Sequence, residues 1–156
     1  MAIFAIDFDG TMVKHSYPFI GEDIGAVPVL KALVENGHKL ILWTMRDHKK
    51  HPNVMSWSSE DSSSEIKLTE IDTLQEAIDW CKERGIELYG VNENPDQTWS
   101  ESPKACANFY IDDAALGVPL LCPDLDERPY VDWRSVAHWL WMNGFITKQQ
   151  YTESTK

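Results

Sequence analysis

The sequence has few cysteines, few basic residues and no long apolar run. Its 3 cysteines form no CxxC pattern, which argues against a disulfide framework and against a thiolate zinc site. Its 14 Lys and Arg are outnumbered by 25 Asp and Glu, and a net charge of −11 argues against a binder of nucleic acid or of anionic membranes. No run approaches the roughly 20 apolar residues of a membrane span, and no secretory signal is visible. We therefore expect a cytoplasmic protein with reduced thiols that does not bind membranes and is not a general binder of nucleic acid.

The apolar residues that are present suffice for one packed domain. The chain has 156 residues, of which 43% are hydrophobic. Short apolar runs alternate with segments whose apolar residues recur at helical spacing. We predict one domain over 1–146 and a fraying polar tail over 147–156. The expected strands are 3–6, 39–44, 86–91, 108–111 and a short fifth one at 118–121, and the expected helices are 27–36, one carrying Ile71 to Cys81, and 133–143.

Strands that alternate with helices predict an α/β fold with a parallel sheet. Ligands bind such sheets beyond the carboxyl ends of the strands. Polar residues follow each of the first four expected strands, so we expect them to meet at one edge of the sheet. These residues are Asp7 and Asp9, then Thr44, then Asn92 and Asn94, then Asp112 and Asp113.

The segment 46–65 differs from the rest of the chain. It is polar and serine-rich, and it predicts a long loop of low intrinsic order. It begins just after Thr44, so its start lies at the rim of the expected site. We expect it to act as a mobile cover over the substrate, the alternative being an inert surface insertion.

The run Asp7-Phe8-Asp9-Gly10-Thr11 places two carboxylates two residues apart at a turn. One carboxylate can attack an electrophile while the other moves a proton to or from the leaving group. Together with the later Asp pair, four carboxylates at one rim require a hard divalent cation, most naturally Mg²⁺. Lysine and threonine side chains are suited to holding phosphate oxygens. Taken alone, a DxDG string is also a common turn, so the prediction depends on the whole set.

The order DFDGT, LWTMR, a later lysine and YIDDAA resembles the haloacid dehalogenase (HAD) superfamily. The strings GHKLILWTMR, NENP, SPKACANFYIDDAALG and VDW are similar to its small, capless, phosphatase-like members. The resemblance implies a three-layer Rossmann-like sheet without a separate cap domain. It also implies that the active site is open, or covered by a loop or by a second copy in a homo-oligomer. The segment 46–65 is longer than this capless pattern leads us to expect.

The resemblance further implies a role for each matched residue. Asp7 is the expected nucleophile, which forms an aspartyl-phosphate, and Asp9 is the expected general acid and base. Thr44 and Lys104 are expected to bind phosphoryl oxygens, and Arg46, Asn92 and Asn94 are weaker candidates for substrate contacts. Mg²⁺ is expected on the Asp7 side chain, the Asp9 carbonyl group and Asp112, with Asp113 in support.

These features predict a magnesium-dependent hydrolase of small phosphomonoesters. An aspartate at the second position of the motif is typical of the phosphatases and phosphomutases of the superfamily, whereas its dehalogenases lack it. A phospho-accepting receiver module and a catalytically silent binding module are the alternatives. The leaving group stays open among sugar phosphates, nucleotides and the phosphorylated end of a polynucleotide.

Overall fold

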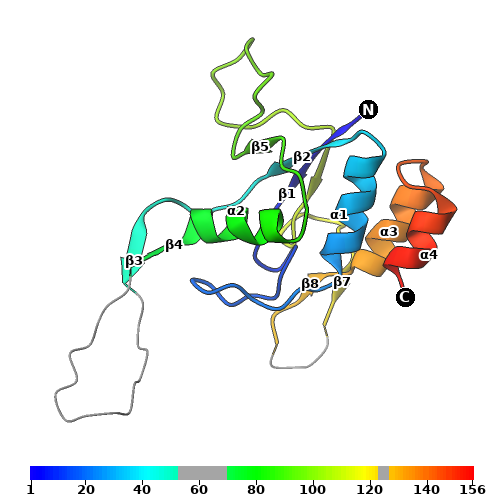
Figure 1. Cartoon of the computed structure of the whole chain (residues 1–156), viewed down its shortest axis with the longest axis horizontal. Coiled ribbons are helices and arrows are strands. Elements are labelled where there is room, and N and C mark those ends of the chain that lie inside the picture. The colour runs from blue at the N-terminus through cyan, green and yellow to red at the C-terminus, as the bar shows by residue number, and fades with distance from the viewer. Residues whose placement is uncertain (53–69, 123–126) are drawn as a thin grey trace.

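A four-stranded parallel sheet forms the centre of the fold in the computed structural model, which describes residues 1–52, 70–122 and 127–156. The strands follow the order β5-β2-β1-β6 (Figure 1). All neighbours are parallel, and this confirms the predicted α/β class. The strands are β1 (Ile3–Ile6), β2 (Lys39–Leu42), β5 (Gly90–Val91) and β6 (Phe109–Ile111).

Four helices occur in the described part of the chain, and three of them were expected. They are α1 (Ala26–Glu35), α2 (Thr73–Glu83), α3 (Trp133–Met142) and α4 (Lys148–Ser154). The aspartates Asp72 and Asp132 accept backbone hydrogen bonds at the starts of α2 and α3, which satisfies otherwise unpaired N–H groups.

The prediction of a fraying tail after residue 146 is wrong. Thr147 and Gln150 form a capping box that starts α4. The Tyr151 ring stacks on Trp141 of α3, with the ring centres 5.0 Å apart. The helix thus joins α1 and α3, which lie beside it in Figure 1. Composition alone missed this because α4 buries none of its residues fully.

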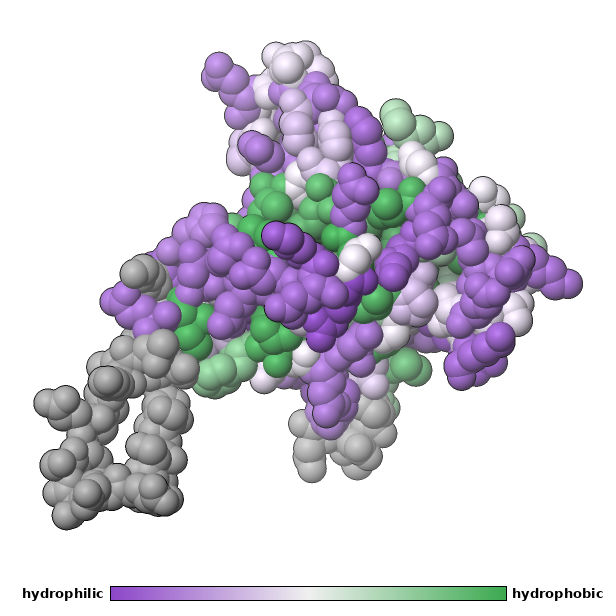
Figure 2. Space-filling view, in the orientation of Figure 1, coloured by the Kyte–Doolittle hydropathy of each residue, from purple (hydrophilic) through white to green (hydrophobic). Residues whose placement is uncertain are grey.

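The two faces of the sheet are covered differently. Buried residues of α1, α2 and α3 form one core cluster with Phe4, Ile6, Leu40 and Leu42, whose side chains share a face. On the other face, Ala5 and Ile41 cluster with Ala105, from the segment between β5 and β6. Polar residues cover the outward side of α2, as Figure 2 shows. This packing leaves the carboxyl ends of the strands free to carry polar groups.

The expected loop at 46–65 begins differently from the prediction. Residues Lys50–Pro52 form β3, which pairs antiparallel with β4 (Glu70–Asp72) ahead of α2. Residues 53–69 lie outside the described residues, so the expected mobile cover and the expected absence of a cap domain stay predictions.

The expected strand at 118–121 is β7 (Leu120–Leu121), which pairs with β8 (Tyr130–Val131) in a separate small sheet. No helix among the described residues has the length and apolar character needed to span a bilayer.

Candidate active site

The register of the sheet brings the predicted motifs together. Ile6 of β1 is paired with Leu42 on one side and with Ile111 on the other, at the last residue of each strand. The residues that follow therefore start side by side, and the Asp7 N–H donates to the carbonyl oxygen of Ile111 over 2.9 Å. Asn92 lies alongside, because its N–H donates to Leu42. The meeting of polar residues at this edge, expected from the sequence, is thus found for the first, second and fourth strand ends and for Asn92.

A tight turn follows Asp7 and fixes its carboxylate. Gly10 adopts φ +84°, which L side chains rarely adopt, and a Cβ there would lie 2.2 Å from the ring of His15. Thr11 is fully buried, and its hydroxyl donates to Asp7 over 3.1 Å while it accepts from the Asp113 N–H over 3.0 Å. The indole N–H of Trp133 donates to the Thr11 carbonyl oxygen. The Thr11 hydroxyl group therefore connects the segment of Asp7 to the segment of Asp113 by hydrogen bonds.

Three carboxylates converge at this point. Asp7, Asp112 and Asp113 each offer one oxygen atom, and these atoms lie within 4.8 Å of one another. Burial raises the pKa of Asp7 from 3.8 to about 7, and the charges of Asp112 and Asp113 add to the shift against hydrogen bonds from Phe8 and Thr11. A divalent cation would favour the ionised form of this carboxylate. Three close oxygen ligands with half-buried side chains fit a hard cation such as Mg²⁺.

Asp9 is not part of this cluster, because Arg46 holds it. The guanidinium group donates from Nε and Nη2 to the two oxygens of Asp9, over 2.7 and 2.8 Å. Its other N–H groups reach the carbonyl oxygens of Pro18, Phe19 and Thr73. All five donors of the group are used, and the residue is 2% exposed. Arg46, expected as a substrate contact, is therefore a buried cross-link between the turn at Asp9, the segment at 17–19 and the start of α2.

The two predicted asparagines differ in what they do. Asn92 has φ 53° and accepts from the N–H of Thr44 over 2.8 Å, so it positions the threonine. The Thr44 hydroxyl accepts from the Arg46 N–H over 3.2 Å. Asn94 donates to the carbonyl oxygen of Cys106 over 2.7 Å and accepts from the N–H of Asp96, which is a turn contact. Thr44 and Asn92 line the site, whereas Asn94 is not among its lining residues.

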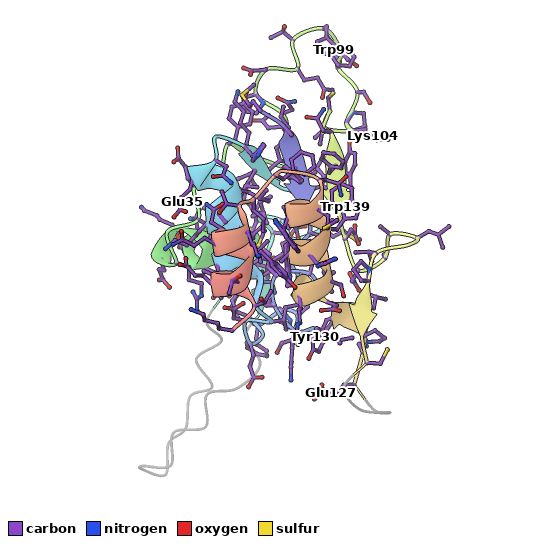
Figure 3. All side chains as sticks on the ribbon, turned by 90° about the vertical axis from the view of Figure 1, so that its right-hand side faces the viewer. Glu35, Trp99, Lys104, Glu127, Tyr130 and Trp139 are labelled. Atoms are coloured by element: carbon purple, nitrogen blue, oxygen red, sulfur yellow. The ribbon has the colours of Figure 1, made fainter. Side chains whose placement is uncertain are left out.

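The site is a cavity of about 880 Å³, and Lys104 is not part of its wall. The neighbouring Pro103 lines the cavity, while the Lys104 side chain is exposed, with its Nζ atom 5.4 Å from the centre of the Tyr110 ring. Figure 3 shows Lys104 on the segment ahead of β6. The structure thus brings together four of the predicted residues, Asp7, Thr44, Asp112 and Asp113. Asp9 also lines the cavity, where it is paired with Arg46. Lys104, which was expected to bind phosphate, does not line the cavity.

Sequence reasoning missed several lining residues. His15 lies 3.1 Å from a carboxylate oxygen of Asp113, and both side chains are 16% exposed. Tyr17, Trp43, Met45 and Arg128 also line the cavity. Thr11 carried a signal, since it stands in the DFDGT motif. His15 and Arg128 carried none, because loops bring them to the site from segments without a motif.

Comparison with known proteins gives one match of full length. No model of a protein family and no curated protein matches the chain. A solved structure described as that of a conserved protein from Bacteroides thetaiotaomicron is 31% identical, with a TM-score of 0.59. The match covers 96% of this chain and 95% of that one. This chain belongs to the family of that conserved protein. The description names no activity, ligand or partner, so the family brings a shared fold and no function.

Proposed function

We propose that the protein is a HAD-type, magnesium-dependent hydrolase of phosphomonoesters. The convergence of the Asp7, Asp112 and Asp113 oxygen atoms beside Thr44 in one cavity carries this proposal. This group of carboxylates lies at the carboxyl ends of parallel strands, where α/β sheets bind ligands. The finer fold assignment, a three-layer Rossmann-like HAD domain, belongs to the same proposal. In this proposed three-layer arrangement, the helices cover one face of the sheet, and the segment between β5 and β6 forms the layer on the other face.

The carboxylate cluster fits Mg²⁺, which would be held by Asp7, the Asp9 carbonyl group, Asp112 and Asp113. The support is the close set of oxygen atoms together with the pKa of Asp7, which burial raises and which the charges of Asp112 and Asp113 raise further, so that a cation would favour the ionised form. When bound, the cation neutralises charge between the anionic nucleophile and the anionic substrate. Hard oxygen ligands favour Mg²⁺ over softer transition metals.

In the proposed reaction, one oxygen of the Asp7 carboxylate attacks the phosphorus atom. The bond between phosphorus and the ester oxygen breaks, and a proton from Asp9 passes to the departing oxygen. Asp9, now ionised, takes a proton from a water molecule as this water attacks the phosphorus of the aspartyl-phosphate. Inorganic phosphate leaves and the Asp7 carboxylate is restored. Thr44 orients the phosphoryl group by donating a hydrogen bond from its hydroxyl group.

The contact between Asp9 and Arg46 bears directly on this sequence of steps. Both oxygens of Asp9 accept from the guanidinium group, so Asp9 has to exchange that contact before it reaches a leaving-group oxygen. Arg46 is thereby a positioning residue for Asp9. The side chain of Asp9 is 19% exposed and lines the cavity, which leaves it a route to the substrate.

A catalytically silent binding module is the second candidate. The observations in its favour are that Asp9 is held by Arg46 and that Lys104 lies outside the cavity wall. A phosphate-binding module needs the cation and the threonine but no proton transfer. The receiver module has less support, because Thr44 and Lys104 stand between the two acidic clusters in the chain instead of following them.

Turnover with magnesium separates these candidates. The wild-type protein, incubated with a panel of phosphomonoesters and Mg²⁺, should release phosphate over many cycles, and Asp7→Asn should lose at least about a hundredfold of the rate, or about 2.7 kcal/mol. A receiver would take up one phosphoryl group from a donor and lose it slowly. A silent module would bind and release the esters unchanged. Retention of the fold in Asp7→Asn is checked by circular dichroism.

A further inference from the structure

The cavity that holds the acidic cluster is much larger than a phosphoryl group. Its volume of about 880 Å³ falls within the range of sites that enclose whole organic ligands. Three carboxylates, those of Asp7, Asp112 and Asp113, converge at one part of the wall. The rest of the cavity therefore has to take the leaving group, and its lining indicates what kind of group fits.

Three large side chains with apolar surface are among the residues that line the cavity. Tyr17, Trp43 and Met45 line the same cavity as the acidic cluster. Met45 is 98% exposed and Tyr17 is 53% exposed, so both present apolar surface to whatever enters. The Tyr17 ring lies 5.4 Å from the guanidinium carbon of Arg46 and offers a flat aromatic surface. Aromatic rings stack on such surfaces, and thioethers make favourable contacts with ring edges.

Several polar side chains of the wall are already paired with one another. Asp9 and Arg46 are bound to each other, and His15 is bound to Asp113. The side-chain oxygen of Asn92 accepts from Thr44. The hydroxyl groups of a polyol would have to compete with these pairs, whereas an aromatic ring needs no hydrogen-bond partner.

We propose that the preferred substrate is a phosphomonoester whose leaving group carries a planar aromatic ring, bound against Tyr17, Trp43 and Met45. This inference rests on the proposed function and names the substrate class of the same site. A nucleoside 5′-monophosphate and an aryl phosphate both have this chemistry. Arg128, a further cation, lines the same cavity.

Adenosine 5′-monophosphate and ribose 5-phosphate form a matched pair for the test, because they share the departing 5′-oxygen and differ by the base. O-phosphotyrosine is the aryl arm. Dissociation constants are measured by calorimetry on Asp7→Asn with Mg²⁺, and kcat/KM is measured on the wild-type protein. We expect at least one ring-bearing ester to bind about tenfold more tightly than ribose 5-phosphate. The ester that does so distinguishes a nucleotide site from an aryl phosphate site.

Substitutions of the apolar wall locate the preference. Met45→Ala and Tyr17→Leu, each combined with Asp7→Asn, should reduce the ratio of the two affinities at least threefold. Leu116→Ala is the matched control, since Leu116 is fully exposed but does not line the cavity, and it should leave the ratio unchanged. Equal affinity for all three esters, no binding of any, or a ratio that neither wall substitution alters would overturn the inference. Turnover of ribose 5-phosphate with no preference for a ring would overturn it while leaving the proposed hydrolase intact, whereas binding without turnover would overturn the hydrolase instead.

Discussion

Replacement of Arg46 by methionine should destabilise the protein strongly, because the guanidinium group is buried and fully paired. Its side chain is 1% exposed, and it donates two hydrogen bonds to Asp9 and three to backbone carbonyl oxygens. Methionine keeps most of the volume and removes all five donors. A carboxylate and three carbonyl groups then lose their partner.

The expected loss follows from the burial of the pair. Breaking a buried ion pair by removing one partner costs about 3–5 kcal/mol. The Asp9 side chain is 19% exposed, so water can partly replace the lost partner. We therefore expect the free energy of unfolding to fall by about 3 kcal/mol, near the lower end of that range. For a chain of this length, that corresponds to a fall of roughly 6–12 °C in Tm.

Urea denaturation followed by circular dichroism measures this loss. Arg134→Met is the control, because Arg134 is exposed, and it should change the free energy of unfolding by less than about 0.5 kcal/mol. In a double-mutant cycle, Arg46→Met and Asp9→Asn should show a coupling of at least about 1.5 kcal/mol. A coupling near zero, or an Arg46→Met protein as stable as the wild type, would refute the assignment of Arg46 as a positioning cross-link.

Three further predictions concern the acidic turn and the C-terminal helix. Gly10→Ala should destabilise the protein more than Gly37→Ala does, since both positions have positive φ but only at Gly10 would a Cβ meet a histidine ring at 2.2 Å; chemical denaturation of both variants compares them. In EDTA, the free energy of unfolding should decrease as the pH rises from about 4 to 7, because the pKa of Asp7 is raised to about 7 and the folded state then binds more protons than the unfolded state. Thermal unfolding at several pH values would show this slope, and the slope should become smaller in Asp7→Asn. Tyr151→Ala should lower stability by about 1 kcal/mol through the loss of its stacking on Trp141, and an unchanged urea midpoint would contradict the role given to α4.

The parallel sheet and three of the helices could be predicted because their signals are local. Apolar runs marked the strands, and apolar residues at helical spacing marked α1, α2 and α3. The helix α4 depends on a stack between Tyr151 and Trp141 and on contacts with α1, which periodicity in a polar segment does not show. The pairing of β3 with β4 joins segments that a long insertion separates in the chain. Such non-local contacts have no counterpart in the local pattern.

The candidate site shows the same division. Asp7, Thr44 and the Asp112–Asp113 pair follow strands of a parallel sheet, whose carboxyl ends share one edge, so their meeting could be predicted. The burial and pairing of Arg46 could not be predicted, because three of its five hydrogen bonds go to carbonyl oxygens of other segments. The Lys104 Nζ atom lies 5.4 Å from the centre of the Tyr110 ring, a contact that a spacing in the sequence does not reveal.

The most direct test of the central claim is to look for the phosphoryl group on Asp7. The protein is mixed with Mg²⁺ and a substrate found in the ester panel, the reaction is stopped with acid during turnover, and the peptides are analysed by mass spectrometry. The account predicts a peptide that carries one extra phosphoryl group on Asp7, and no such peptide from Asp7→Asn. Continued release of phosphate with Asp7 unmodified, or a phosphoryl group found on another residue, would contradict it.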